Sequence, residues 1–385
     1  MLGVKGRSKT FDILKFSLKK DDKTIWFHCA SLGEYEQGLP VFEAIKKHYS
    51  NHKIVLSFFS PSGYEIRKES PIADIVVYLP LDTKANAKQF LELVYPELII
   101  FVKYDIWPNY LSEIKKRQIR AILISALFRK EQRFFKIYGK WMQKSLHTFE
   151  HIFVQNDNSK MLLKSINYNN VTVSGDTRFD RVFNQLNMNN ILDFIADFKQ
   201  DKLCIVAGST WPEDEALWVD YINTSSHDVK YIIAPHDIKP QRIKNLQIKL
   251  QKKAVLFSEK EKSDLSTSQV FIIDTVGILS KIYSYADLAY VGGAMGKTGL
   301  HNTLEPAVFS IPIIIGNHYE KFPEAHQMID NGGMFSISNQ STFNSIVNRL
   351  ISDASFRLES GKINSAFIKK NKGVVSTITN YLNIE

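Results

Sequence analysis

Short runs of β-branched, aromatic and leucine residues recur along the chain, separated by stretches long enough for an amphipathic helix. The runs are almost continuously apolar, which is typical of parallel strands buried on both faces of a sheet. Alternation of such strands with helices predicts α/β domains with doubly wound parallel sheets. We expect strands at 24–30, 53–59, 74–79, 97–102, 120–125, 150–155 and 171–174, and then at 202–207, 229–234, 269–273, 287–291 and 312–315.

Two such series of strands in a chain of 385 residues predict two domains. Polar residues are dense between 180 and 200, so we place the connection there and expect domains at 1–185 and 186–385. The segment 354–384 predicts one or two helices, and the last of them is a candidate for crossing back to the first domain.

The composition is that of a soluble globular protein, since 44% of the residues are hydrophobic and 23% are charged. A net charge of +9 permits attraction to anionic membranes, nucleic acid or phosphorylated substrates, or is simply a solvated basic face. Cys29 and Cys204 each lie in an apolar run, which predicts small buried side chains rather than a disulfide or metal ligands. A reducing compartment is therefore expected.

The first 23 residues are basic and loosely amphipathic, without an apolar core long enough for a signal peptide. No run approaches the roughly 18–20 apolar residues that cross a bilayer. Two interpretations stay open for this segment: it lies on a membrane surface, or it docks as a helix on the first domain.

Ligands of doubly wound domains bind beyond the carboxyl ends of the strands, so the loops at those ends are the places to search. Among them the run 291–316 is the strongest functional signal in the chain, with glycines at 292, 293, 296 and 299 followed by Asn302 and a helical segment with Glu305. Glycines let backbone N–H groups approach a phosphate, and a carboxylate on the next helix suits sugar hydroxyls. The run thus predicts a nucleotide-sugar site, with a connection that binds nothing as the alternative.

Other nucleotide motifs are missing from the chain. The run lacks the Walker lysine-serine ending, and no G-x-G-x-x-G opens a βαβ unit, so neither an ATPase nor a dehydrogenase is favoured. His301, His318 and His326 do not have the spacing of metal ligands, so we expect no metal site. The tryptophans are scattered, which argues against a stacking platform for nucleic acid.

Three further strand-end loops carry candidate chemistry. Glu34 follows Gly33 and opens a helix, where it is either a general base for an acceptor hydroxyl or an acid at a helix start, stabilised by about 0.3–1 kcal/mol. Ser209, in the loop 207–210, is a donor to phosphate oxygens or part of a strand-to-helix cap. His236 ends another strand, and a lone histidine there is more often a satisfied polar group than a ligand.

Four elements together resemble the Kdo (3-deoxy-D-manno-octulosonic acid) transferases of lipopolysaccharide assembly, from about residue 22 to the C-terminus. They are S-x-G-E at 31–34, W-P-N at 107–109, G-x-x-x-F-D at 175–180, and VGG…G-x-H-N-x-L-E-P-A at 291–307. The resemblance implies a GT-B enzyme of two doubly wound Rossmann-like domains that face an inter-domain cleft. Such an enzyme is expected to transfer Kdo from CMP-Kdo to a lipid A precursor, lipid IVA, with inversion and without a cofactor. It is expected at the cytoplasmic face of the inner membrane, with no nucleic-acid partner.

The resemblance also assigns roles to residues. It makes Glu34 the general base and Glu305 the partner of the ribose, with the acceptor bound by the N-terminal domain and the donor by the C-terminal domain. The donor residues that it implies are Ser209, His236, Gly292, Gly293, Asn302 and Glu305. The implied acceptor residues are Ser31, Gly33, Lys103 and Asp105.

The chain departs from the family pattern in three places. Residues 103–105 (Lys-Tyr-Asp) stand where many members have E-x-E, so Lys103 reverses a charge near the acceptor. Pro235-His236-Asp237 stands where many members have P-R-H, which leaves His236 and Lys297 as candidates for the cation that faces the CMP phosphate. The family usually begins with a hydrophobic anchor, so we expect attachment through an anchor outside this sequence or through the basic N-terminal face.

Two rival functions remain at this stage. One is a GT-B glycosyltransferase that uses a UDP-sugar donor. The other is a non-catalytic, basic, membrane-associated protein with the same fold, against which the retained Glu34 and Glu305 argue.

Overall fold

The computed structural model describes residues 2–103, 106–136 and 139–384. The chain divides into two compact units: the first ends at Arg181 and resumes at Asn371, and the second is Val182–Lys370. The division therefore falls between 181 and 182, where the sequence predicted 185 and 186. The last helix belongs to the first unit.

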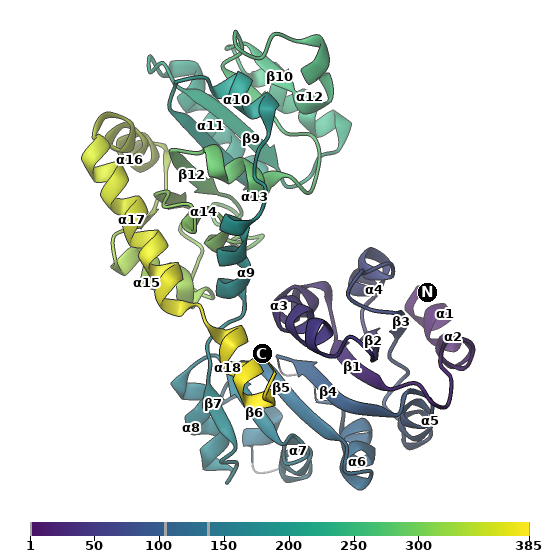
Figure 1. Ribbon diagram of the computed structural model, residues 1–385. Helices are drawn as coiled ribbons and strands as arrows, with labels where there is room; N and C mark the ends of the chain where they lie inside the picture. The colour runs from purple at the N-terminus through teal and green to yellow at the C-terminus, as the bar shows by residue number, and fades with distance from the viewer. Residues whose placement is uncertain (1, 104–105, 137–138, 385) are drawn as a thin grey trace. The chain divides into compact units, whose positions relative to one another are not determined.

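The first unit contains a seven-stranded, all-parallel sheet in the order β3-β2-β1-β4-β5-β6-β7 (Figure 1). Successive residues of β1 enter different cores, because Trp26 packs in the cluster on one face and Phe27 in the cluster on the other. Both faces are thus apolar, as predicted. The strands are β1 (Thr24–Cys29), β2 (Lys53–Phe58), β3 (Ile75–Tyr78), β4 (Pro96–Val102), β5 (Arg120–Ala126), β6 (His151–Val154) and β7 (Val171–Val173).

Helices cover both faces of this sheet (Figure 1). The last of them, α18, is held at its start by Asp180, whose carboxylate accepts the N–H groups of Gly373 (2.9 Å) and Val374 (3.1 Å). The helices are α1 (Leu2–Ser8), α2 (Thr10–Ser17), α3 (Leu32–His48), α4 (Pro61–Arg67), α5 (Lys84–Val94), α6 (Pro108–Lys116), η1 (Arg133–Phe135), α7 (Lys140–Leu146), α8 (Asp157–Ser165) and α18 (Val374–Leu382). Helix α9 (Arg178–Asn184) contains the boundary between the two units.

The N-terminal helices dock on the sheet edge formed by β3. Leu14 is fully buried in the core, and the Thr10 hydroxyl donates to the carbonyl of Tyr78 at 2.8 Å. Of the two interpretations left open above, docking is confirmed for these residues, although Phe16 remains 95% exposed. Within the described residues, no helix has the length and apolar character needed to span a bilayer.

The second unit repeats the architecture, with a seven-stranded parallel sheet in the order β10-β11-β9-β8-β12-β13-β14 (Figure 1). Two edge strands, β10 and β14, were not predicted. Their sequences, Ala-Val-Leu and Met-Phe-Ser, contain at most one β-branched residue, whereas the equally short β11 and β13 contain two and three. The strands are β8 (Cys204–Thr210), β9 (Lys230–Pro235), β10 (Ala254–Leu256), β11 (Val270–Ile272), β12 (Leu288–Val291), β13 (Ile313–Ile315) and β14 (Met334–Ser336).

The longest helix of the second unit is α17, with 18 residues. Cys29 and Cys204 are buried and form no disulfide, as predicted, and burial raises the pKa of the Cys204 thiol to about 12. The helical segments are η3 (Gln185–Asn187), α10 (Asp193–Lys199), α11 (Pro212–Thr224), α12 (Pro240–Lys249), η4 (Phe257–Lys262), α13 (Leu279–Ile282), η5 (Tyr283–Tyr285), α14 (Leu304–Ala307), α15 (Pro323–Asp330), α16 (Gln340–Ser352) and α17 (Ala354–Asn371).

Candidate functional site

The predicted site residues gather at the point in each sheet where the strand order reverses. This switch point lies between β1 and β4 in the first unit and between β8 and β12 in the second. Loops that leave neighbouring strands there in opposite directions open a crevice for ligands. Ser31, Gly33 and Glu34 follow β1, and Lys103 follows β4. Asp105 lies outside the described residues.

Glu34 is a buried carboxylate on the first turn of α3. Its side chain is 7% exposed, and Oε2 accepts the backbone N–H of Ala30 at 2.5 Å. That hydrogen bond closes the turn from β1 into α3, while the N-terminal end of the helix favours negative charge. The structure therefore fixes the position of this carboxylate, and its role as a base stays a prediction.

Lys103 turns the chain at the end of β4. Its φ is +71°, a left-handed conformation that costs a residue with a Cβ about 1–2 kcal/mol, and its N–H donates to the carbonyl of Ile124 at 2.8 Å. The side chain is half-buried. Its assignment to the acceptor stays a prediction, as do those of Ser31 and the exposed Gly33.

The G-x-x-x-F-D element ties the end of the first unit to α3. Asp176, 5% exposed, accepts hydrogen bonds from Gln37 Nε2 at 3.1 Å and from Arg178 Nε at 2.8 Å. Gln37 lies one turn after Glu34 on α3. The two acids of the element thus have positioning roles, because Asp176 holds α3 and Asp180 holds α18.

The W-P-N triplet is anchored by a histidine that the sequence did not single out. Trp107 Nε1 donates to Nε2 of the fully buried His28 at 3.0 Å, and His28 Nδ1 lies 2.8 Å from Ser57 Oγ. Because the indole N–H is only a donor, Nε2 of His28 accepts and Nδ1 carries the proton. Asp82 then accepts the N–H of Asn109 at 3.1 Å where α6 begins. The triplet therefore has a structural role.

In the second unit the loop after β8 is packed closely against the glycine-rich run. Ser209 stands at an irregularity in the pairing of β8 with β9 and has a φ of +53°. A Cβ on Gly292 would lie 2.4 Å from the carbonyl oxygen of Ser209. Gly293 has a φ of +97°, and its Cβ would lie 2.1 Å from the carbonyl oxygen of Gly299. Only glycine permits this close approach at 292 and 293.

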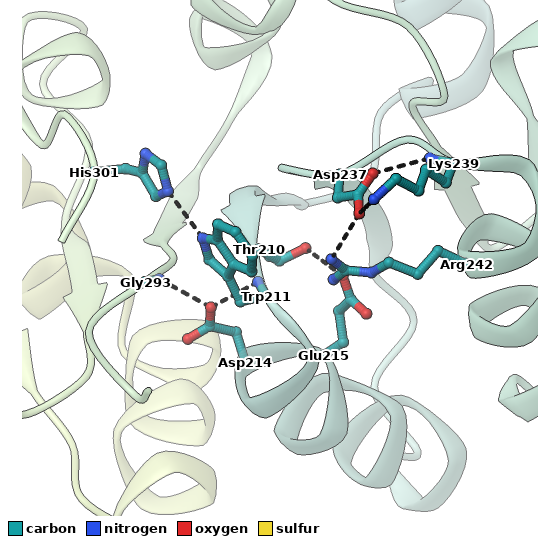
Figure 2. A network of polar contacts seen from close by, with 9 residues as sticks. All are labelled: Thr210, Trp211, Asp214, Glu215, Asp237, Lys239, Arg242, Gly293 and His301. Atoms are coloured by element: carbon teal, nitrogen blue, oxygen red, sulfur yellow. Dashed lines mark hydrogen bonds and ion pairs between the residues drawn. The ribbon is translucent and has the colours of Figure 1, made fainter. Parts of the chain in front are cut away.

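Asp214, which no sequence motif marks, joins these two loops. It is fully buried, and its Oδ2 accepts the N–H groups of Trp211 (2.8 Å) and Gly293 (2.9 Å), as Figure 2 shows. Its Oδ1 accepts the Tyr290 hydroxyl at 2.6 Å. Burial raises the pKa of Asp214, and these hydrogen bonds oppose that shift.

This network corrects one expectation about the glycines. The N–H of Gly293 is taken by Asp214, and that of Gly292 donates to the carbonyl of Gly208 at 3.0 Å. These two N–H groups are therefore engaged within the protein, and the idea that they point at a phosphate is wrong for this structure. Their contribution is the tight packing that brings neighbouring side chains to the edge of the sheet. Their place in a donor site stays a prediction.

Three aromatic rings meet at this edge, from the ends of β8, β9 and β12. Trp211 Nε1 donates to His301 Nε2 at 3.0 Å (Figure 2), and the two ring planes differ by 14°. The exposed His236 lies over both, with its ring centroid 4.7 Å from that of Trp211 and 4.5 Å from that of His301. Burial, with a smaller effect of His236, lowers the pKa of His301 to about 4.

Charged side chains of α11, α12 and the loop between β9 and α12 form ion pairs beside the rings. Arg242 contacts Glu215 at 3.0 Å and Asp237 at 3.8 Å, and Lys239 contacts Asp237 at 3.1 Å (Figure 2). These cations are matched by the two carboxylates. His236 and the exposed Lys297 therefore stay the candidates for a cation that faces a phosphate.

The H-N-x-L-E-P-A segment forms the turn and short helix that were expected. Asn302 Oδ1 accepts the N–H of Leu304 at 3.2 Å, and α14 carries Glu305. The Glu305 carboxylate accepts hydrogen bonds from Asn302 Nδ2 at 3.0 Å and from Ser280 Oγ at 2.8 Å. The part of the chain that the structure describes holds no cluster of three or more histidine, cysteine or acidic side chains suited to a metal ion.

Comparisons with known proteins agree with these motifs. Residues 5–181 match the family model described as 3-deoxy-D-manno-octulosonic-acid transferase (kdotransferase). The chain is 27% identical over 375 residues to the 3-deoxy-D-manno-octulosonic acid transferase of Haemophilus influenzae, covering 93% of this chain and 86% of that protein. It is also 27% identical over 344 residues to the protein of the same name from Aquifex aeolicus, covering 88% and 89%.

Solved structures support the fold. A UDP-GlcNAc 2-epimerase from Neisseria meningitidis superposes with a TM-score of 0.67 at 14% identity, over 94% of this chain and all of that one. A glycosyltransferase from Rickettsia africae superposes with a TM-score of 0.59 at 12% identity, over 94% of this chain and 98% of that one. At these identities the likeness is one of fold.

Two doubly wound parallel-sheet units, each with candidate residues at its switch point, define the GT-B fold. The sequence matches show that this chain with the GT-B fold is a glycosyltransferase. The matched sequences further show what the chain is similar to: residues 5–181 match the Kdo transferase model, and Kdo transferases of two bacteria align with 88–93% of the chain.

Proposed function

We propose that the protein transfers Kdo from CMP-Kdo to a hydroxyl of a lipid A precursor, lipid IVA, with inversion at the anomeric carbon. One observation carries the proposal: a chain that matches the Kdo transferases keeps a carboxylate at the switch point of each unit. Glu34 is buried after β1 in the first unit, and Glu305 follows β12 in the second unit. A protein that kept only the fold would need neither carboxylate.

In this reaction the acceptor oxygen forms a bond to the anomeric carbon of Kdo. The bond from that carbon to the phosphate oxygen of CMP breaks, and its electron pair leaves with CMP. The acceptor hydroxyl gives its proton to the carboxylate of Glu34. The hydrogen bond from Ala30 fixes the position of that carboxylate on the first turn of α3, and general base catalysis requires a base held within reach of the hydroxyl.

On the donor side, Glu305 is the residue that we assign to the ribose. A carboxylate that accepts from Asn302 and Ser280 has the same chemistry as one that accepts from the two ribose hydroxyls. The phosphate of CMP gains negative charge as it leaves, and His236 or Lys297 would stabilise that charge as a cation.

We further propose that the protein acts at the cytoplasmic face of the inner membrane, because its acceptor is a lipid. The net charge of +9 and the exposed Phe16 in the last turn of α2, which is followed by the exposed Lys19 and Lys20, support peripheral attachment there. Attachment through an anchor outside this sequence is the alternative.

Binding of CMP is expected to stabilise the second unit more than UDP or GDP does. A nucleotide at about 100 times its Kd adds about 2.7 kcal/mol of stability, which raises the Tm of a domain of this size by roughly 5–10 °C. Thermal unfolding with each nucleotide measures the difference. A larger shift with UDP would favour the UDP-sugar rival. Salt-dependent binding of nucleic acid with no shift by any nucleotide would favour the non-catalytic rival.

A further inference from the structure

We propose that Trp211 is a positioning residue that fixes the tautomer of His301, so that His301 Nδ1–H donates a hydrogen bond to an anionic oxygen of the nucleotide-sugar donor. The inference rests on the proposed function, because it specifies how the second unit holds its donor. Neither the family motifs nor the comparisons assign a role to Trp211.

The geometry of the two rings carries the argument. Trp211 Nε1 and His301 Nε2 are 3.0 Å apart, the ring centroids are 6.5 Å apart, and the planes differ by only 14°. The rings therefore meet edge to edge and nearly in one plane, as two paired bases do. An indole N–H is only a donor, so His301 Nε2 must accept, and the proton of the neutral imidazole must be on Nδ1.

Both rings are held in place by the Asp214 clamp, by which we mean the hydrogen bonds from the N–H groups of Trp211 and Gly293 to Asp214. These hydrogen bonds tie the start of α11 to the glycine-rich run. His301 donates its own backbone N–H to the carbonyl of Gly292 at 3.2 Å. A Cβ on Gly293 would lie 3.1 Å from His301 Cδ2, so the glycine makes room for the ring. The clamp thus fixes the relative positions of indole and imidazole.

The surroundings of His301 keep it neutral. His236 stacks over the pair, and burial with the nearby His236 lowers the pKa of His301 to about 4. In Figure 2 one nitrogen of His301 meets the indole and the other turns away from it. Within the described part of the chain, Nδ1 has no hydrogen-bond partner and is not a buried unpaired atom, so it faces solvent. A neutral N–H there is a fixed donor for a phosphate or carboxylate oxygen.

The first unit contains the same bond in a purely structural setting, which provides a matched control. Trp107 also donates to a histidine Nε2 at 3.0 Å, but His28 is fully buried and its Nδ1 is bonded to Ser57. Replacing Trp107 by phenylalanine removes an equivalent hydrogen bond within the first unit. It should leave the state of His301 unchanged.

The first measurement needs no variant. Nitrogen-15 NMR of the full chain should show His301 with its proton on Nδ1 and still neutral at pH 6. A proton on Nε2 in the wild-type protein would overturn the inference. In Trp211→Phe, which keeps a ring for His236 to stack on, the tautomers should mix and the pKa of His301 should rise, whereas Trp107→Phe should match the wild type.

Calorimetry with CMP then tests whether the Nδ1–H group of His301 binds the nucleotide. Trp211→Phe should weaken CMP binding by roughly 5- to 10-fold, as expected for a weakened hydrogen bond to a charged oxygen. His301→Asn places an amide N–H at the position of Nδ1 and should retain most of the affinity, whereas His301→Leu should lose it. In the His301→Asn background, Trp211→Phe should have no further effect.

The outcomes separate the inference from the proposed function. A wild-type protein that does not bind CMP contradicts the proposed function itself. Weaker CMP binding by Trp211→Phe supports the inference with a phosphate oxygen as acceptor. A higher KM for CMP-Kdo with unchanged CMP affinity supports it with the carboxylate of the sugar as acceptor. If the wild type binds CMP and both quantities are unchanged in Trp211→Phe, the inference is overturned and the proposed function stands.

Discussion

Replacing Glu34 with glutamine is expected to slow Kdo transfer by roughly 100- to 10,000-fold, the usual contribution of a general base. Glutamine does not take up the acceptor proton, but its amide oxygen still accepts the Ala30 N–H that closes the turn into α3. The variant should therefore fold normally and bind CMP as the wild type does. The rate of transfer from CMP-Kdo and the Tm together measure the two expectations.

Glu43→Gln is the matched control, since it makes the same change at an exposed position of the same helix. It should transfer Kdo at nearly the wild-type rate. A Glu34→Gln protein with the wild-type Tm and near-full transfer would show that another group takes the proton.

Asp214→Ala is expected to lower the free energy of unfolding of the second unit by about 3–5 kcal/mol. The substitution leaves three donors without their acceptor in a buried site: the N–H groups of Trp211 and Gly293 and the Tyr290 hydroxyl. It also opens a cavity in a fully buried position. Urea unfolding of the variant, compared with the wild type, measures the loss.

Two neighbouring substitutions calibrate this result. Asp214→Asn keeps an acceptor oxygen and should lose less than Asp214→Ala, while Glu213→Ala changes an exposed acid and should stay within about 0.5 kcal/mol of the wild type. Equal stabilities of Asp214→Ala and Glu213→Ala would mean that the clamp does not stabilise the second unit.

Much of the fold could be predicted because its strands are long apolar runs between helical stretches. β1 and β4 are buried along almost their whole length, so their sequences differ sharply from the helices beside them. β10 and β14 have few β-branched residues, unlike the equally short β11 and β13, and their place at the sheet edges comes from pairing with those two strands. Local sequence carries too little of that tertiary pairing to predict them.

The site was predictable where its residues follow one another in the chain and not where distant segments meet. The glycine-rich run, Asn302 and Glu305 form one continuous motif. The Tyr290–Asp214 and Trp211–His301 bonds join residues 76 and 90 positions apart, and no local pattern reports them. The error about the glycine N–H groups has the same origin, because Asp214 occupies one of them from another element.

The most direct test of the central claim is to incubate the purified protein with lipid IVA and CMP-Kdo generated in situ, and to analyse the lipid by mass spectrometry. The account predicts lipid that carries Kdo, release of CMP in equal amount, and no product when a UDP-sugar replaces CMP-Kdo. Unmodified lipid in the presence of CMP-Kdo, or a product formed only from the UDP-sugar, would contradict it.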